Sequence, residues 1–230
     1  MPARIFAPQL AHFAKTHRVI ALDPRSQGES QIAPGGHEPG RRSADIAELL
    51  ANLGPSTDPV VLVGWSLGVL DSLAYVARNG DQRVAGLVLV DNSVGEDPPP
   101  VIRFNIIAAL RKDRAGTVRD FVRGMYKTAQ TDAYLDELVR TALRTPLGPA
   151  IELLSYPVPR EYWRDAIYAT RKPVLYAVTP RFAGQADNLR KKHTSAQAEV
   201  FSGAGHALFV DEPARFNQLM DEFLMRRVWQ

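Results

Sequence analysis

The chain has 230 residues, of which 45% are hydrophobic and 23% charged, a balance typical of one globular domain with a substantial core. Its formal net charge is only +3 and its arginines are scattered, so no basic stripe indicates a nucleic-acid partner. The absence of cysteine excludes disulfides, thiol catalysis and thiolate metal ligands. No apolar stretch approaches the roughly 20 residues of a membrane span and no signal peptide is visible, so a cytoplasmic protein is expected.

Short apolar, β-branched runs alternate with amphipathic helical patterns along the chain. This alternation predicts an α/β fold with a mostly parallel sheet that helices cover on both faces. The expected strands are residues 19–22, 60–63, 86–90, 174–178 and 198–201. Between the first two, Ser43 is expected to cap a helix that runs through Ile46 and Leu50 and stops at Gly54-Pro55.

The run Pro98-Pro99-Pro100 interrupts this alternation, and residues 101–170 carry short helical patterns without a strand pattern. We therefore expect a core formed by residues 1–97 and 171–230 and a helical cap formed by residues 98–170. An insertion after a strand of an open sheet lies where ligands bind, so the functional interpretation is a lid over the site. The alternative is a helical subdomain that merely completes the core.

The sequence Gly64-Trp65-Ser66-Leu67-Gly68 follows the strand at 60–63 and opens a helical pattern that ends at Asn79-Gly80. A serine at a sharp strand-to-helix turn adopts a strained geometry that exposes its hydroxyl, and the two glycines are expected to remove colliding Cβ atoms. The amide of Leu67 then lies at a helix N-terminus, where it can donate to an oxyanion. Ser66 is the candidate nucleophile, and a simple helix N-cap is the alternative.

A serine nucleophile needs a base, and His206 sits in the glycine-rich loop Gly203-Ala204-Gly205-His206, directly after the last expected strand. A helix is expected to start near Glu212-Pro213, with Asp211 as its N-cap. The remaining histidines lie in polar or helical stretches and are expected to be exposed surface groups: His12, His17, His37 and His193. His206 is therefore the candidate base.

Together with these motifs, the segment Asp23-Pro24-Arg25-Ser26-Gln27-Gly28-Glu29-Ser30 makes the chain resemble the α/β-hydrolase superfamily over almost its whole length. The segment is similar to the family's Asp-x-Arg-Gly-x-Gly-x-Ser motif, with Ser26 where glycine is usual, and its residues are interpreted as structural. The resemblance is to serine hydrolases of the esterase and cofactor-free haloperoxidase type. It implies acyl transfer through a serine-bound intermediate, with neither a metal nor an organic cofactor.

The resemblance leaves the acid of a Ser-His-Asp triad open. The family's commonest position falls on Phe182, which cannot orient a histidine. Asp91, at the end of the strand at 86–90, matches the place that some members use, and a carboxylate at a strand end is rigidly held. Asp187, after the strand at 174–178, is the alternative. Asp91 is favoured, although an aspartate at this place can also be a turn residue.

The family's loop that donates the second oxyanion amide, and the strands before it, have no counterpart here, so the resemblance is to a member that lacks these parts. A water, Trp65 or the N-terminal amine remain open as the second donor. We expect a homodimer or larger assembly to cover the sheet edge that the missing strand leaves open, which light scattering at micromolar concentration tests. Neither a nucleic acid nor a membrane is expected as a partner.

The predicted reaction is hydrolysis of a small carboxylic ester. Ser66 attacks the carbonyl, His206 takes its proton, Asp91 orients His206, and the Leu67 amide stabilises the oxyanion. Large side chains are candidates for an apolar substrate pocket, although such residues are more often core: Trp65, Phe104, Phe121, Met125, Tyr126, Tyr156 and Trp163. The rival functions are perhydrolysis or carbon-carbon bond cleavage on the same triad, and a catalytically silent scaffold or binding protein.

Overall fold

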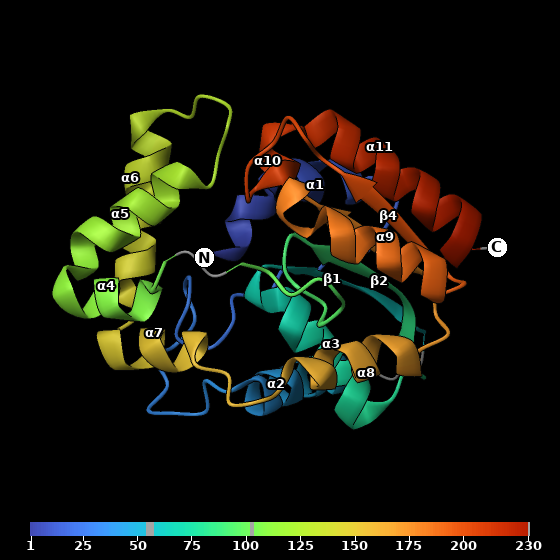
Figure 1. Ribbon diagram of the computed structural model, residues 1–230. Helices are drawn as coiled ribbons and strands as arrows, with labels where there is room; N and C mark the ends of the chain where they lie inside the picture. Colours follow the sequence, from blue (N-terminus) through green and yellow to red (C-terminus); the bar gives the residue numbers. More distant parts are fainter. Residues whose placement is uncertain (54–57, 102–103, 230) are drawn as a thin grey trace. The chain divides into compact units, whose positions relative to one another are not determined.

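The computed structural model describes residues 1–53, 58–101 and 104–229 (Figure 1). The chain divides into two compact units. The first, called the sheet unit here, comprises Pro39–Val101, Pro157–Ser202 and Leu219–Gln230. The second, called the helical unit, comprises Met1–Glu38, Ile102–Tyr156 and Gly203–Gln218.

The sheet unit contains a four-stranded sheet in the order β1-β2-β3-β4, in which every neighbouring pair is parallel. The central strands β2 and β3 are almost entirely buried. Because helices cover both faces of a parallel sheet, these strands read as continuous apolar runs instead of alternating patterns. The strand bounds are β1 Val60–Trp65, β2 Val84–Val90, β3 Val174–Val178 and β4 Ala196–Val200.

Helices of the sheet unit cover its two faces (Figure 1). On one face α3 packs against β1 and also contacts α2 and α8. On the other face α9 packs against β3 and β4, while Phe223 and Val228 at the end of the chain approach Gly86 of β2. The bounds are α2 Pro39–Asn52, α3 Leu67–Asn79, α8 Arg160–Ala169, η2 Pro180–Phe182, α9 Ala183–Lys192 and the π-helical turn η3 Leu224–Val228. The helix α11 Pro213–Phe223 is divided between the two units after Gln218.

The helical unit is built from short helices, and local capping explains why they are short. Asn105, Asp113 and Thr131 each precede a helix and accept a hydrogen bond from one of its first amides, which separates consecutive helices. Within the unit α5 contacts both α4 and α6, and α4 contacts α7. The bounds are η1 Ala3–Phe6, α1 Ala7–Phe13, α4 Ile106–Lys112, α5 Arg114–Gly124, α6 Asp132–Arg144, α7 Leu147–Leu154 and α10 Leu208–Asp211.

The α/β class with a parallel sheet is confirmed, as are the strands expected at 60–63, 86–90, 174–178 and 198–201, with ends that differ by a few residues. The expected helical character of 101–170 is also found in the described part of that segment. However, α8 belongs to the sheet unit and α4 to α7 belong to the helical unit. A lid role for residues 98–170 stays a prediction. In the described ranges, no helix combines the length and the apolar character needed to cross a bilayer.

The strand expected at residues 19–22 does not form. A strand forms only where a neighbouring strand pairs with its backbone N–H and C=O groups. A short apolar run does not by itself ensure that such a neighbour is present. Val19, Ile20 and Leu22 are instead about two-fifths exposed. Among the described residues the sheet ends at β1, so its edge pairs with no further strand and association across it stays a prediction.

The expected cap at Ser43 is also wrong, because α2 begins earlier, at Pro39. Proline is favoured in the first turn of a helix since its fixed φ suits the helix and its missing N–H would have no partner there. Ser43 lies inside the helix, and its hydroxyl donates to the Gly40 carbonyl at 2.8 Å. The expected stop at Gly54-Pro55 lies outside the described residues.

A buried ion pair joins α2 to α3 inside the sheet unit. The Arg42 Nε donates to Asp71 Oδ1 at 2.8 Å, and Arg42 Nη2 lies 2.6 Å from the same oxygen. Burial raises the pKa of Asp71 to about 6, although the Arg42 guanidinium beside it acts in the opposite direction. Above that pH the two charges compensate each other, so removing one alone leaves the other buried without compensation.

We therefore predict that Arg42→Met lowers the free energy of unfolding by about 3–5 kcal/mol at pH 8, measured by urea denaturation. The double variant Arg42→Met/Asp71→Leu should recover most of this loss because neither charge remains buried. Arg41→Met, which removes a partly exposed arginine that pairs with Asp45 and Glu48, is the matched control and should cost less than about 1 kcal/mol. Equal losses for Arg42→Met and Arg41→Met would contradict this view of the pair.

Candidate active site

Ser66 occupies a strained turn between β1 and α3. Its backbone has φ 54° and ψ −119°, a conformation that a non-glycine residue rarely adopts and that costs on the order of 1–3 kcal/mol. The helix begins at the next residue, Leu67, and the Ser66 side chain makes no capping hydrogen bond to it. The predicted strand-turn-helix geometry is confirmed; Ser66 takes the N-cap position of α3, but not with the capping hydrogen bond that the alternative would supply.

The two glycines around this turn have different roles. A Cβ on Gly64 would lie 2.3 Å from the Gly68 carbonyl oxygen, so only glycine fits there. A Cβ on Gly68 would meet nothing within 4 Å, and the expectation that both glycines avoid such a collision is wrong for Gly68. The close approach is between the Gly64 backbone and the first turn of α3.

The groups around Ser66 fix the turn and place an amide beside it. Asn92 Nδ2 donates to the Ser66 carbonyl at 2.9 Å, and the Val69 amide donates to the same oxygen at 3.0 Å. Leu67 is the first residue of α3, so its N–H has no partner within the helix and lies at the positive end of the helix dipole. An N–H in this setting is suited to an oxyanion.

Asp91 occupies the position after β2 that corresponds to Ser66 after β1. Trp65 pairs with Val90 in the parallel register, and the Ser66 amide donates to the Val90 carbonyl at 2.9 Å. Asp91 is buried and has a positive φ of 48°. Its Oδ1 accepts hydrogen bonds of 2.7 Å from both the amide and the hydroxyl of Thr179, just beyond β3. The sheet therefore brings Ser66 and Asp91 together at its carboxyl edge.

The alternative acid, Asp187, lies in a different setting. It projects from α9 with its side chain 55% exposed and forms an ion pair with Arg190 at 2.8 Å. An exposed pair one turn apart on a helix is an ordinary surface feature. Phe182 lies in η2 and is buried. The choice between Asp91 and Asp187 as the acid stays a prediction.

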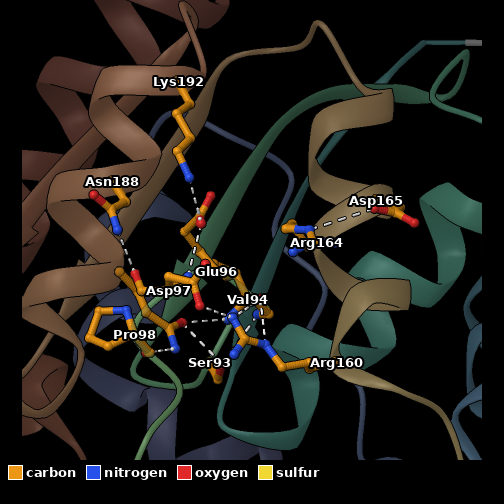
Figure 2. Close-up of polar contacts among 12 residues, drawn as sticks. Ser93, Val94, Glu96, Asp97, Pro98, Arg160, Arg164, Asp165, Asn188 and Lys192 are labelled. Carbon is orange, nitrogen blue, oxygen red and sulfur yellow. Dashed lines mark hydrogen bonds and ion pairs between the residues drawn. The ribbon is translucent and has the colours of Figure 1, made fainter.

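The loop that follows Asp91 is anchored by charged side chains from α8 and α9 (Figure 2). Arg160 donates to the Gly95 carbonyl and to Asp97 Oδ1, the latter at 2.7 Å. Lys192 pairs with the buried Glu96 at 2.9 Å, and Asn188 donates to the Asp97 carbonyl. Sequence reasoning missed these contacts because their partners lie more than 60 residues apart, and no local pattern signals them.

His206 belongs to the helical unit, in the loop that leads to α10. The ring of Phe121, from α5, lies with its centroid 6.2 Å from that of His206 at an interplanar angle of 65°. A Cβ on Gly205 would lie 2.5 Å from the Met125 carbonyl oxygen, so this glycine allows the loop to approach the turn after α5. Phe121 is thus a pocket candidate whose ring lies against His206.

Asp211 is not the N-cap of the final helix, because α11 begins at Pro213 and Asp211 ends α10. Its carboxylate accepts hydrogen bonds from the amides of Gly205, Lys127 and Thr128 and from the Thr128 hydroxyl. Burial acts to raise the pKa of Asp211, but these hydrogen bonds outweigh it and hold the pKa below its ordinary value. The sequence placed this residue correctly near a helix start but missed its partners.

Two histidines expected on the surface are buried: His37 and His193. His37 Nε2 lies 2.8 Å from the Ser26 hydroxyl and its Nδ1 lies 2.6 Å from Glu152 Oε2, so polar partners compensate for its burial. His193 Nε2 lies 3.1 Å from the Thr170 carbonyl. Both expectations were wrong because partners distant in the sequence make a buried imidazole favourable.

The motif segment that starts at Asp23 is structural, as expected. Asp23 accepts hydrogen bonds from the amides of Ala3 and Glu29, and Ser26 has a positive φ of 61° where the family usually has glycine. The Ser26 hydroxyl accepts from the Ala33 amide at 2.9 Å, which helps to hold this unusual conformation. In the same unit the Met1 amine, named above as a possible oxyanion donor, donates to Gln27 Oε1 at 2.8 Å.

The other pocket candidates are spread over several environments. Met125 is buried, the Tyr126 hydroxyl lies 3.3 Å from that of Tyr134, and Phe104 is 63% exposed. Trp163 is buried in α8 of the sheet unit, where it packs edge-on against Tyr162. Trp65 and Tyr156 are partly buried. Among residues 1–53, 58–101 and 104–229, no three His, Asp or Glu side chains are arranged to hold a metal ion.

Comparison with known proteins gives both sequence and structural relatives. A non-heme haloperoxidase from Rhodococcus erythropolis is 40% identical over 87 residues, which span 38% of this chain and 30% of that protein. A pimeloyl-[acyl-carrier protein] methyl ester esterase from Yersinia enterocolitica is 28% identical over 196 residues, which span 78% of this chain and 74% of that protein. The crystal structure of an esterase from a Rhodococcus species has a TM-score of 0.84 at 24% identity, covering 99% of this chain and 87% of its own.

The structural similarity by itself shows the fold, and the match to a protein family shows more. The family described as "Alpha/beta hydrolase family" matches residues 1–219, which is nearly the whole chain. The match includes Ser66, Asp91 and His206 together with the segments that position them. The chain therefore belongs to the alpha/beta hydrolase family, and hydrolysis is the reaction class that this membership supports.

Proposed function

We propose that this protein is a carboxylic-ester hydrolase that uses Ser66 as its nucleophile. The observation that carries the proposal is the strained conformation of Ser66 at a strand-to-helix turn, with Asp91 fixed at the adjacent strand end. A residue in a rarely populated conformation is maintained only where its surroundings enforce it, and such positions cluster at functional sites. The serine hydroxyl at this turn is the expected attacking group of an alpha/beta hydrolase.

In the proposed reaction the Ser66 hydroxyl attacks the ester carbonyl while His206 accepts its proton. The negative charge that develops on the carbonyl oxygen is stabilised by the Leu67 amide. The tetrahedral intermediate collapses to an acyl-serine, and His206 returns the proton to the leaving alcohol. A water activated by His206 then releases the acid and restores Ser66. Asp91 holds His206 in the tautomer and orientation that these proton transfers need.

The relatives and the surroundings of His206 support this substrate class. Two of the similar proteins are named as esterases, and one of them as a methyl ester esterase. Phe121 places an aromatic ring beside the proposed base, which favours an ester with an aromatic group or a short to medium acyl chain. The rival reaction, perhydrolysis, draws on the similarity to a haloperoxidase. A shared triad can serve both, and substrate profiling separates them.

The triad is tested by hydrolysis of p-nitrophenyl acetate, butyrate and octanoate. Ser66→Ala and His206→Ala should each reduce kcat by about 10⁴-fold or more. Asp91→Asn should cause a loss of similar order because the histidine is left in the wrong tautomer. Asp187→Asn, which changes an exposed carboxylate by the same substitution, is the matched control and should stay within about two-fold of the wild type.

The result that would overturn the proposal is a wild type no faster than Ser66→Ala on all three esters, together with no labelling of Ser66 by a fluorophosphonate. That outcome would favour the catalytically silent scaffold. Labelling of Ser66 without turnover of these esters would support Ser66 as the nucleophile and show that these esters are not substrates, so other acyl donors would be tested. A larger effect of Asp187→Asn than of Asp91→Asn would assign the acid to α9.

The turn itself is tested by a pair of glycine substitutions. Gly64→Ala should reduce the rate of fluorophosphonate labelling at Ser66 by about 100-fold, since its Cβ would collide with the Gly68 carbonyl and shift the turn. Gly68→Ala, which makes the same change at an uncrowded position within α3, should fold normally and raise stability by up to about 1 kcal/mol. Thermal denaturation measures stability for both. Equal tolerance of the two substitutions would contradict the crowding argument.

A further inference from the structure

We propose that Asp211 is a positioning residue for His206, and that it joins the loop carrying the base to the turn between α5 and α6 so that the two move together. This inference rests on the proposed function, in which His206 is the base. It concerns Gly205–His206–Ala207, called the base loop here, and residues 125–128, called the α5–α6 turn. Both segments and Asp211 belong to the helical unit.

The Asp211 carboxylate bridges the two segments with both of its oxygens. Oδ2 accepts from the Gly205 amide at 2.7 Å and from the Lys127 amide at 2.9 Å. Oδ1 accepts from the Thr128 amide at 3.0 Å and from the Thr128 hydroxyl at 2.5 Å. One buried side chain thus holds the amide of Gly205, the residue before His206, and two consecutive amides of the turn.

A second hydrogen bond fixes the base loop on the other side of His206. The Ala207 amide donates to the Met125 carbonyl at 2.9 Å. The amides of the residues before and after His206 are therefore both bonded, that of Gly205 to Asp211, which also holds the α5–α6 turn, and that of Ala207 directly to this turn.

The number of hydrogen bonds argues against a direct catalytic role for Asp211. A carboxylate has about four sites at which it can accept hydrogen bonds, and four donors already occupy those of Asp211. The carboxylate has therefore no remaining site for an imidazole N–H of His206. Three backbone amides and a hydroxyl also suit a permanently ionised anchor, because each of them stabilises the charged form.

The arrangement has a consequence for substrate binding. Phe121 of α5 lies against His206, and the α5–α6 turn follows this helix directly. A substrate that displaces α5 or α6 would therefore move the base through Asp211 and Met125. Misplacement of a catalytic group by about 1 Å can cost about 100-fold in rate, so the clamp makes turnover sensitive to the position of these helices.

The test compares Asp211→Asn with Glu212→Gln in the 230-residue chain. Asparagine keeps the shape of the side chain but replaces one acceptor oxygen with an NH2 donor. This donor then faces other donors, either the Gly205 and Lys127 amides or the Thr128 amide and hydroxyl. Glu212→Gln is the matched control: it changes the next carboxylate, which forms an ion pair with Arg215. We expect Asp211→Asn to lower kcat on p-nitrophenyl acetate by about 10- to 100-fold with little change in KM, and Glu212→Gln to match the wild type.

Thr128 provides a finer pair of variants at the other end of the clamp. Thr128→Val removes the hydroxyl donor while keeping the shape of the side chain, and Thr128→Ser keeps the hydroxyl. We expect Thr128→Val to show a smaller loss of kcat than Asp211→Asn, and Thr128→Ser to retain the wild-type value. Thermal denaturation of each variant shows whether the protein is folded at the assay temperature.

A readout independent of activity is the NMR resonance of the His206 ring in protein labelled at histidine, assigned by its loss in His206→Ala. The inference predicts a shifted ring resonance in Asp211→Asn but not in Glu212→Gln. It is overturned if Asp211→Asn keeps both the kcat and the His206 resonance of the wild type, whether or not its melting temperature falls. Failure of the proposed function gives a different result, namely an inactive wild type that a fluorophosphonate does not label.

Discussion

The parallel pairing of β1 with β2 is the constraint on which the candidate site depends. Parallel strands end at the same edge of a sheet, and the register that pairs Trp65 with Val90 makes Ser66 and Asp91 the next residue on each strand. The hydrogen bond from the Ser66 amide to the Val90 carbonyl extends this pairing one step beyond the ladder. Ser66 and Asp91, the proposed nucleophile and acid, therefore take their places from backbone hydrogen bonds.

Three non-glycine residues in the described part of the chain have a positive φ: Ser26, Ser66 and Asp91. Ser26 and Ser66 lie within sequence motifs, Asp91 directly follows β2, and polar contacts hold each one in place. The Ser26 hydroxyl bonds to the Ala33 amide, the Ser66 carbonyl accepts from Asn92, and Asp91 accepts from Thr179. Strain of this kind costs on the order of 1–3 kcal/mol per residue and persists only where the surroundings enforce it. Strand ends and their anchored loops supply that enforcement for Ser66 and Asp91, and hydrogen bonds to Ala33 and His37 supply it for Ser26.

The base is positioned by a different kind of structure. His206, the proposed base, lies in the helical unit, where the buried Asp211 carboxylate and the Met125 carbonyl hold its loop. A sheet edge gives Ser66 and Asp91 a rigid setting, whereas the setting of the base depends on short helices that local caps separate. Motion of those helices would thus affect the base before it affects the nucleophile.

The sequence by itself determined the α/β class, four of the strands, the strand-turn-helix setting of Ser66 and the family to which the chain belongs. These features depend on local properties: apolar runs, glycines at a crowded turn and motifs a few residues long. Only the tertiary structure decided that residues 19–22 form no strand, that His37 and His193 are buried, that Asp187 lies on an exposed helix and that Asp211 clamps the base loop. Each of these outcomes depends on a partner distant in the sequence, such as a neighbouring strand, a carbonyl or a pair of amides. No local pattern encodes such a partner, because hydrogen bonds and burial are properties of the packed chain.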